Sequence, residues 1–490
     1  METRKEPYGG SSLMAHKITV IGAGPGGYVA AIRAAQLGAE VTIIEQEAVG
    51  GTCLNWGCIP SKVMKTTAEM LEKFRRAQEF GIEVHGTVSP DMKALMVRKE
   101  KVIRDQTEGV LKLLKHHKIT YLAGRGTIEG PNRVVARLLD GRRIEVRWDS
   151  LILATGSHQV SIPSFLFDGQ RIISTNDALC LEEVPESVLI LGGGVIGCEF
   201  AFILAALGAQ VTVVEALSRM LPLPWVDEDS SKVLEREMKK RKIMFMLNRT
   251  VSGIDMGGEK CRVTVGPYSA EQGPEHKPVK TSVVEVDKIL ICVGRRPVTQ
   301  GIGVEELGVK LDESGWIVAG ERMETSASGV YAIGDILGPS KIMLAHVASR
   351  EGIVAAENAM GRHKTMTYDV VPGAAFTMPE VANVGLTEAQ AKERGYHIRS
   401  DSVLFRNLGK PHVIGEIAGH AKIVSDGESG RVLGVHIVGP HASDLIAEAA
   451  LGMKLGCTVQ DLADTIHAHP TLAEVLFEAS LKGLDRPLHG

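Results

Sequence analysis

The sequence predicts an α/β fold with two Rossmann-like dinucleotide-binding domains and a C-terminal α+β domain. A unit of strand, glycine-rich turn, helix and strand occurs twice, at residues 18–45 and 188–215. From about residue 366 onward, short alternating apolar runs such as AKIVSD and RVLGVHIVG indicate an antiparallel sheet with flanking helices. The 490 residues provide enough chain for about three domains.

Each copy of the repeat ends in a glutamate, which completes a dinucleotide-binding pattern. The first glycine of such a turn permits a tight bend, the second lets the backbone approach a pyrophosphate, and the third allows the helix to pack on the strand. The helix N-terminus faces the anion, and the acid binds ribose hydroxyls. A duplicated scaffold without a ligand is the alternative, but the complete unit in both copies favours two sites. The residues concerned are Gly22, Gly24, Gly27 and Glu45 in the first copy and Gly192, Gly194, Gly197 and Glu215 in the second.

The predicted ligands are FAD at the first turn and NAD at the second. Glu215 would repel the 2′-phosphate of NADP, and no arginine occurs between it and Arg219. The first copy of the repeat ends shortly before Cys53, so its ligand must reach the cysteines that follow. A flavin dinucleotide fits that position because a disulfide exchanges electrons readily with a flavin.

The stretch GTCLNWGCIPS places Cys53 and Cys58 five positions apart. On a regular helix this spacing advances about 500°, so the two thiols would not share a face. A bridge needs Cα atoms within roughly 7 Å, and therefore a distorted turn, which Gly57 could supply. A disulfide across so short a loop constrains the unfolded chain little. The pair is either redox-active, or two buried thiols, or half of a zinc site. The seven scattered cysteines are not typical of a secreted disulfide framework.

Composition excludes several classes of function. A net charge of −4 gives no electrostatic footprint for nucleic acid or an anionic membrane. No apolar run has the length of a spanning helix, and no metal site is predicted. The polar start lacks the features of a signal peptide, so we expect a cytoplasmic protein. Residues 1–15 are predicted to be a disordered tail, with Met14 as a conceivable alternative start.

Several motifs together resemble the flavoprotein disulfide reductases. They are GGTCLNWGCIPSK, the two glycine-rich turns, ATGS, YAIGD, MLAH and HAHPTLAE, in the order of that family, over about residues 16–485. The spellings CIPSK and HPTLAE are those of its dihydrolipoamide dehydrogenases. Glu215 speaks against the NADPH-dependent glutathione reductases, and the C-terminus lacks the vicinal cysteines of mercuric reductases. Two residues depart from the family pattern: Trp56 between the cysteines, and Phe376 where tyrosine is usual.

The resemblance implies a division into domains and an activity. The expected activity is the oxidation of dihydrolipoyl groups through a Cys53–Cys58 disulfide and FAD, with NAD⁺ as acceptor. The alternatives are a reductase of another small disulfide and a non-catalytic flavin-binding docking subunit. The expected domains are 16–155 with 290–362 for FAD, 156–289 for NAD, and 366–485 for dimerisation.

The resemblance also implies roles for individual residues. Cys53 is expected to be the interchange thiol and Cys58 the thiol beside the flavin. His469 is expected to be the base, acting on the disulfide of the other subunit of a homodimer. Glu474 either orients His469 or closes a capping box with Thr471; His467 is expected to be a structural neighbour. Partners are dihydrolipoamide and a lipoyl-bearing acyltransferase or glycine-cleavage carrier protein.

Lys62 and Glu199 are expected to form an ion pair near the flavin, although an acid in the first turn of a helix is also favoured by its dipole. Asp335 follows a strand and is expected to bind flavin hydroxyls. The remaining expected FAD residues are Gly126, Thr155, Gly156, Ser157, Met343, Leu344, Ala345 and His346; the remaining NAD residues are Val195, Ile196, Val251 and Gly294.

Overall fold

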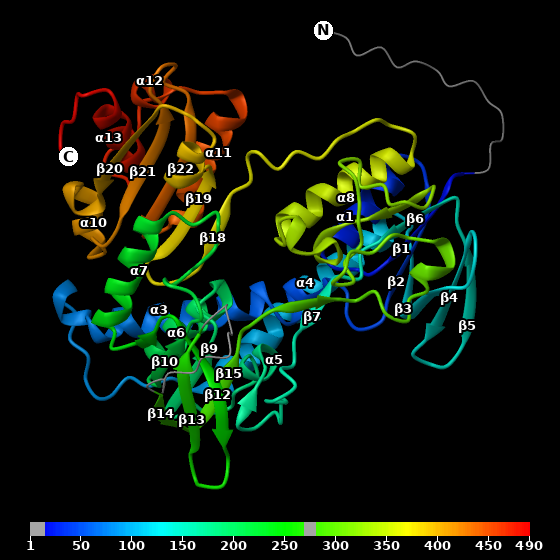
Figure 1. Ribbon diagram of the computed structural model, residues 1–490, viewed down its shortest axis with the longest axis horizontal. Coiled ribbons are helices and arrows are strands. Elements are labelled where there is room, and N and C mark those ends of the chain that lie inside the picture. The colour runs from blue at the N-terminus through cyan, green and yellow to red at the C-terminus, as the bar shows by residue number, and fades with distance from the viewer. Residues whose placement is uncertain (1–14, 269–280) are drawn as a thin grey trace, which may run out of the picture. The chain divides into compact units, whose positions relative to one another are not determined.

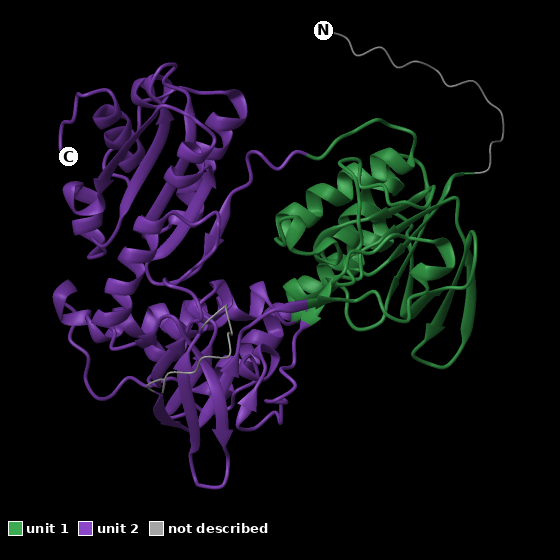
Figure 2. Cartoon of the chain, in the orientation of Figure 1, with its two compact units in different colours: residues 1–55, 105–158, 296–366 green, residues 56–104, 159–295, 367–490 purple. Residues whose placement is uncertain are grey.

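The computed structural model describes residues 15–268 and 281–490. The predicted N-terminal tail, including Met14, therefore lies outside the described residues except for Ala15. The chain forms two compact units (Figure 2). Unit 1 contains residues 1–55, 105–158 and 296–366, and unit 2 contains residues 56–104, 159–295 and 367–490. One boundary between the units falls at residues 55 and 56, just ahead of Cys58.

Unit 1 is built on a sheet with the strand order β17-β6-β1-β2-β3-β4-β5 (Figure 1). Strands β17, β6, β1, β2 and β3 pair in parallel, whereas β3, β4 and β5 pair antiparallel. Its elements are β1 (Lys17–Ile21), α1 (Pro25–Gln36), β2 (Glu40–Glu45), α2 (Gly51–Asn55), β3 (Thr120–Ile128), β4 (Arg133–Leu138), β5 (Arg143–Arg147), β6 (Ser150–Leu153), η2 (Val304–Leu307), β17 (Val330–Ala332), η3 (Gly334–Ser340) and α8 (Ala345–Ala359).

Helices α1 and α8 of unit 1 lie side by side because glycine occurs at their contact (Figure 1). A Cβ atom on Gly352 would lie 2.5 Å from the carbonyl oxygen of Gly26, so the backbones could not approach as closely with any larger residue. Further along the same two helices, the Arg33 guanidinium donates to Glu357. Hydrogen bonding to Arg33 holds the pKa of Glu357 below its usual range, against the smaller opposing effect of burial.

The second copy of the repeat forms a parallel sheet in unit 2, with the order β11-β10-β9-β15-β8, beside an antiparallel sheet β12-β13-β14. Strand β9 is buried on both faces, as parallel strands covered by helices are. The elements are α3 (Cys58–Arg75), η1 (Ala77–Phe80), β8 (Ile172–Ile173), α5 (Thr175–Ala178), β9 (Ser187–Leu191), α6 (Val195–Leu207), β10 (Gln210–Val214), α7 (Glu228–Lys240), β11 (Met244–Met246), β12 (Arg249–Asp255), β13 (Cys261–Pro267), β14 (Ser282–Val286) and β15 (Lys288–Ile291). Helix α4 (Met92–His116) and strands β7 (Ser157–Gln159) and β16 (Arg295–Pro297) continue from one unit into the other.

The C-terminal part of unit 2 is an antiparallel sheet with flanking helices, as the alternating apolar runs predict. Its strand order is β18-β19-β22-β21-β20. The apolar side chains of β19, β21 and β22 pack with α11 and α13 into one core. The elements are β18 (Gly373–Ala375), β19 (Glu380–Gly385), α9 (Glu388–Glu393), β20 (Ile398–Leu404), η4 (Phe405–Asn407), α10 (Gly409–Ile414), β21 (His420–Asp426), β22 (Val432–Gly439), α11 (Ala442–Leu455), α12 (Val459–Asp464) and α13 (Glu474–Gly483).

A buried lysine connects this sheet to helix α7. Lys422 on β21 is 4% exposed, and its ammonium contacts three carboxylates: Asp227 at 3.0 Å, Asp229 at 2.8 Å and Glu388 at 2.8 Å. Burial disfavours the charge, but these carboxylates outweigh it and raise the pKa of Lys422. An isolated buried ammonium would be very costly, so the three acids are what allow a lysine at this position.

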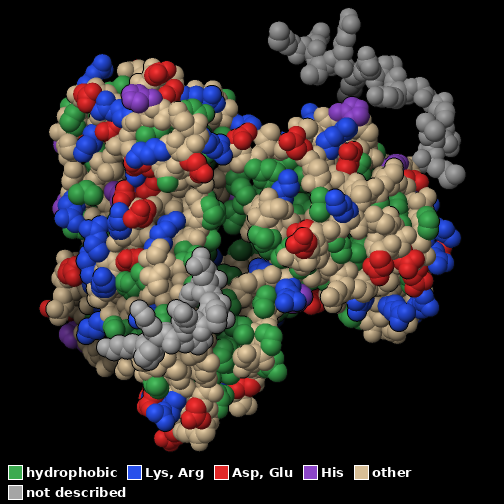
Figure 3. Space-filling view, viewed as in Figure 1, with side chains coloured by type: hydrophobic (Ala, Val, Ile, Leu, Met, Phe, Trp, Pro, Cys, Tyr) green, Lys and Arg blue, Asp and Glu red, His purple; other side chains and the backbone are tan. Residues whose placement is uncertain are grey.

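The described surface has mixed charge. Basic and acidic side chains are interspersed over the face drawn in Figure 3. Among the described helices, none combines the length and the apolar composition that crossing a membrane requires.

We predict that Glu388 makes the protein sensitive to acid. Hydrogen bonds from Lys392 and Lys422 lower the pKa of Glu388 to about 2. Because the folded-state pKa lies below the unfolded value of about 4.3, this contribution to the unfolding free energy is present above the unfolded pKa and is lost as pH falls through the folded pKa. Urea unfolding at pH 5, 4, 3 and 2 should therefore show a smaller loss of stability for Glu388→Gln than for the wild type. Glu393→Gln, an exposed change on the same helix, is the control. Equal pH slopes for Glu388→Gln and the wild type would contradict the prediction.

Candidate active site

The two glycine-rich turns have the same backbone geometry. Gly22 has a φ of +100° and Gly192 a φ of +108°, a region that favours glycine. The Gly22 amide donates to the Ile44 carbonyl and the Gly192 amide to the Val214 carbonyl, both at 2.8 Å. Each of these carbonyls lies on the second strand of its repeat. A Cβ on Gly27 would lie 1.9 Å from the carbonyl oxygen of Gly22, and a Cβ on Gly197 would lie 1.9 Å from that of Gly192. The third glycine is therefore required for the helix to start against the strand.

The second glycine of each turn faces open space. Gly24 and Gly194 are the N-cap residues of α1 and α6, and neither helix has a side-chain capping bond at that position. A Cβ on either glycine would meet no protein atom within 4 Å. Two helix N-termini with room in front of them fit the diphosphates of two dinucleotides, so the residues present are suited to FAD and NAD.

The terminal glutamates hold the turns themselves, a role that the dinucleotide-binding pattern does not predict. Glu45 accepts hydrogen bonds from Ala23 N (2.7 Å) and Glu47 N (2.8 Å). Glu215 accepts from Gly193 N (2.5 Å) and Leu217 N (2.7 Å). Each carboxylate oxygen retains a lone pair for a ribose hydroxyl. Burial raises the pKa of Glu45 and outweighs the opposing backbone hydrogen bonds.

A second group of expected FAD residues comes together in unit 1. The Ser157 hydroxyl donates to Asp335 Oδ2 at 2.8 Å, and Thr155 Oγ1 donates to the Val298 carbonyl at 2.7 Å. The Gly334 amide before Asp335 donates to Glu351 Oε2 at 2.6 Å. Glu351 is 1% exposed and sits on α8, where no sequence motif marks it.

The other expected cofactor residues occupy varied positions. Gly126 lies in β3 opposite Ala136, and the space of its missing side chain is bounded by Ile21 and Ile44. Leu344 is the N-cap of α8, so the segment 343–346 forms the start of that helix. Ile196 in the first turn of α6 is exposed, whereas Val251 is buried in the core beside β13. Gly294 has a φ of +71°.

The cysteine stretch forms the short helix α2 and the start of the longer helix α3, with a break between them. Helix α2 starts against the first glycine-rich turn: the Gly50 amide donates to the Ala23 carbonyl at 2.8 Å, and a Cβ on Gly51 would lie 2.7 Å from Gly24 Cα. Gly57, with φ −143° and ψ −111°, interrupts the helical path and is the N-cap of α3. The predicted distortion at Gly57 is thus present. Cys58 is exposed and is the first residue of α3, where a helix N-terminus favours a thiolate.

The ion pair between Lys62 and Glu199 is present, with 2.8 Å between Nζ and Oε2. The other oxygen of Glu199 accepts the Phe376 amide at 2.9 Å. The alternative interpretation of Glu199 by the helix dipole is wrong, because α6 starts at Val195 and Glu199 lies beyond its first turn. Its two partners explain why a 5% exposed acid occurs there.

Glu474 contacts both residues that its two interpretations name, but the capping box itself is not formed, because α13 begins at Glu474 with Ala473 as its N-cap and the Thr471 hydroxyl donates to the Ala468 carbonyl instead. Glu474 Oε1 lies 2.8 Å from His469 Nδ1, and its Oε2 accepts the Thr471 amide at 2.8 Å. Burial opposes ionisation, but the bonds from His469 and Thr471 hold the pKa of Glu474 below its usual range. The His469 side chain is 77% exposed, so a reacting group can approach it. His467 is 6% exposed and bonds Glu448 at 2.9 Å, as expected for a structural neighbour.

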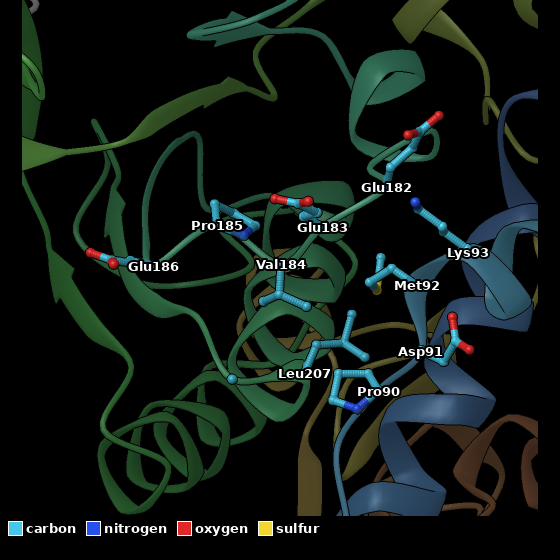
Figure 4. A pocket seen from close by; sticks show the side chains of 11 residues that line it. Pro90, Asp91, Met92, Lys93, Glu182, Glu183, Val184, Pro185, Glu186 and Leu207 are labelled. Atoms are coloured by element: carbon cyan, nitrogen blue, oxygen red, sulfur yellow. The ribbon is translucent and has the colours of Figure 1, made fainter.

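A groove of about 670 Å³ lies elsewhere in unit 2 (Figure 4). Pro90, Asp91, Met92 and Lys93 form one side, and residues 182–186 with Leu207 form the other. None of its lining residues belongs to the expected cofactor or catalytic set.

Family models match the chain in two stretches. Residues 16–352 match the model described as pyridine nucleotide-disulphide oxidoreductase, and residues 371–480 match the dimerisation domain of the same family. The second match supports a homodimer.

Full-length relatives have the same organisation. The chain is 42% identical over 472 residues to the dihydrolipoyl dehydrogenase of Chlamydia muridarum, covering 96% of this chain and 97% of that one. It is 40% identical to the dihydrolipoyl dehydrogenase of Haloferax volcanii, with 96% and 97% covered. The crystal structure of LpdA from Mycobacterium tuberculosis matches with a TM-score of 0.87 at 28% identity, covering 96% and 99%.

These matches confirm the predicted α/β fold class and the prediction of an NAD-dependent oxidoreductase that uses FAD and NAD. The individual site residues and the domain boundaries stay predictions. The match over residues 16–352, together with relatives that are 40% and 42% identical along nearly the whole chain, shows that the chain belongs to the pyridine nucleotide-disulphide oxidoreductase family.

Proposed function

We propose that this chain oxidises dihydrolipoyl groups and passes the electrons to NAD⁺. The observation that carries the proposal is the combination of Cys58 at the start of α3 with the His469–Glu474 pair at 2.8 Å. A flavin-binding docking subunit would need neither. Relatives named dihydrolipoyl dehydrogenase that match 96% of the chain support the choice of substrate.

The proposed exchange is a transfer of two electrons between sulfur pairs. One thiolate of the dihydrolipoyl group attacks Cys53 and breaks the Cys53–Cys58 bond, leaving a mixed disulfide and a Cys58 thiolate. The second substrate thiolate then attacks the mixed disulfide, so the lipoyl disulfide forms and Cys53 leaves as a thiolate. FAD, when bound, supplies a two-electron path from the protein dithiol to NAD⁺.

Both substrate thiols must lose a proton, and we assign that task to His469. Histidine is suited to proton transfer near neutral pH. Glu474 bonds Nδ1, so Nε2 is left as the nitrogen that faces substrate and takes the proton. The carboxylate also stabilises the imidazolium that results.

The site is proposed to be shared between two subunits, with His469 of one chain serving the cysteines of the other. We propose a lipoyl-bearing acyltransferase or a glycine-cleavage carrier protein as the partner that delivers the lipoyl group, since a lipoyl group carried on another protein must reach exposed residues. A cytoplasmic location remains our expectation, and cell fractionation can test it.

The second dinucleotide site is proposed to select NAD by charge. Glu215 is 6% exposed and its carboxylate is fixed by two backbone amides. Arg219, the first arginine after it, donates to Ser231 Oγ at 2.8 Å and to the Leu223 carbonyl at 3.0 Å. Its guanidinium is therefore committed to the protein and is poorly placed to balance a 2′-phosphate.

Replacement of either proposed redox cysteine should abolish turnover with dihydrolipoamide. Cys53→Ser leaves Cys58 as a thiolate beside bound flavin, so the oxidised protein should gain a long-wavelength charge-transfer band, whereas Cys58→Ser should lack it. Absorbance spectra and steady-state rates measure both effects. Cys180→Ser, at an exposed cysteine in the same unit as Cys58, should change neither. Full dihydrolipoamide activity in both redox variants would refute the dithiol mechanism.

Parallel assays with glutathione disulfide test the alternative, a reductase of another disulfide.

His469→Gln should slow oxidation of dihydrolipoamide at least ~10²-fold, the usual effect of losing a general base. Reduction of the flavin by NADH, measured by stopped flow, should be unaffected. Glu474→Gln keeps a group that can accept the bond from His469 but removes the charge, and should lie between the wild type and His469→Gln. A Glu474→Gln rate equal to the wild type would mean that the carboxylate has only its role at Thr471.

Mixed dimers test whether the base acts across subunits. Chains with His469→Gln supply intact Cys53, and chains with Cys53→Ser supply intact His469, so one site of each mixed dimer is complete only if the two come from different chains. Activity should reappear after subunit exchange. Its absence, with exchange verified by mass, would place base and disulfide in one chain.

Glu215→Gln should weaken the discrimination against NADPH by roughly ten-fold, equivalent to about 1.4 kcal/mol of lost repulsion. The amide side chain still accepts a bond from a loop amide. Glu215→Leu should instead destabilise the turn, because buried N–H groups left unpaired cost about 1–3 kcal/mol each. Titrations with NADH and NADPH measure selectivity, and Glu228→Gln, at an exposed position on α7, is the control. Unchanged selectivity in Glu215→Gln would count against the charge argument.

A further inference from the structure

Phe376, directly after β18, contacts both members of the Lys62–Glu199 ion pair. Its backbone amide donates to Glu199 Oε1 at 2.9 Å. Its ring lies against the ammonium of Lys62, with 4.4 Å from Nζ to the ring centroid. The face of an aromatic ring is the negative end of its quadrupole and attracts a cation. Phe376 thus contacts Glu199 through its backbone amide and the Lys62 ammonium through its ring.

A second lysine of α3 also lies near the Phe376 ring. Lys65 Nζ is 5.7 Å from the Phe376 centroid. It is held there by Glu380 at 2.7 Å and Glu69 at 2.8 Å. Burial disfavours the charge on Lys65, but the two carboxylates outweigh burial and raise its pKa. Both neighbours of the ring are therefore ammonium groups with fixed partners.

Lys62 follows Cys58 by about one turn of α3. The two residues are four positions apart on α3, so they share a face of the helix with Cβ atoms about 5–6 Å apart. A nearby ammonium favours the thiolate of a cysteine. A lysine has a long flexible side chain. The degree to which its ammonium stabilises the thiolate therefore depends on how firmly the ammonium is held in place. Glu199 holds the Lys62 charge on one side and the Phe376 ring covers another.

We propose that Phe376 is a positioning residue that keeps the Lys62 ammonium between its ring and Glu199, and thereby sets the thiolate character of Cys58. The inference rests on the proposed function in one respect, that Cys58 is the thiol that becomes a thiolate in turnover. A tyrosine at position 376 retains the ring face and is the conservative replacement. Leucine removes the ring face and keeps an apolar side chain.

The test follows the reactivity of Cys58 in the flavin-loaded protein carrying Cys53→Ser. Alkylation by iodoacetamide is measured between pH 5 and 9, with Cys58 quantified in its own peptide by mass spectrometry. Adding Phe376→Leu should move the pH midpoint upward and lower the rate at pH 7 about five-fold, the factor that corresponds to a cation–π contact of about 1 kcal/mol. Phe376→Tyr should stay within about two-fold of its parent.

Lys62→Met should move the same midpoint further, and adding Phe376→Leu to it should change nothing more, because the ring acts through the lysine. The matched control is Phe245→Leu, which removes another ring beside a lysine, with 5.5 Å from Lys239 Nζ to the centroid. It should leave the Cys58 profile unchanged. Phe376→Met serves as a second variant if the leucine variant does not fold.

Three results would overturn the proposal. The first is an unchanged Cys58 profile in Phe376→Leu and Phe376→Met, and the second is additive effects of Lys62→Met and Phe376→Leu. The third is a loss of lipoamide turnover when Phe376→Leu is placed in the protein with Cys53 intact, without a shift of the profile in the Cys53→Ser protein, which would mean a structural role only. Failure of the proposed function is separate, because it would appear as absent dihydrolipoamide oxidation in the wild type while the alkylation profile still responded to Phe376.

Discussion

The close contact between the third glycine of each repeat and the carbonyl of the first is the constraint on which the rest of the architecture depends. With 1.9 Å from a Cβ at Gly27 or Gly197 to that carbonyl oxygen, no other residue fits. The contact brings the N-terminus of α1 or α6 to the end of its strand and leaves Gly24 and Gly194 facing open space. Helix α2 then starts against the first turn, so the position of Cys53 follows from the same contact.

Glu199 has a comparable role in unit 2. The Glu199 carboxylate accepts hydrogen bonds from Lys62 on α3 and from the amide of Phe376, the residue after β18. These bonds connect the helix that begins with Cys58 to the edge of the C-terminal sheet. Lys65 and Glu380 make a second tie a turn further along, and Glu380 also accepts the amide and hydroxyl of Ser443 at the start of α11. Charges that would be costly when buried alone are instead shared among fixed partners.

The His469–Glu474 pair shows how a local motif serves structure and chemistry together. The carboxylate satisfies the Thr471 amide ahead of α13 and also fixes the His469 ring. The nearby His467–Glu448 pair has a similar bond length, but the His467 side chain is only 6% exposed, so its imidazole is far less accessible to a substrate. Exposure, rather than the presence of a carboxylate partner, distinguishes the two histidines.

The sequence by itself determined the features that depend on neighbours along the chain. The glycine turns, the break at Gly57 and the alternating strands of the C-terminal sheet all follow from local backbone preference and hydrophobic period. The resemblance to a family added the Lys62–Glu199 pair, which no local rule predicts. Only the tertiary structure decided which residues meet as partners. Phe376 bonds Glu199, Gly334 bonds Glu351, and three carboxylates surround Lys422. These contacts join residues up to 195 positions apart. They arise because a buried charge must find opposite charge or hydrogen-bonding groups wherever the fold brings them, and a linear pattern does not encode which segment that will be.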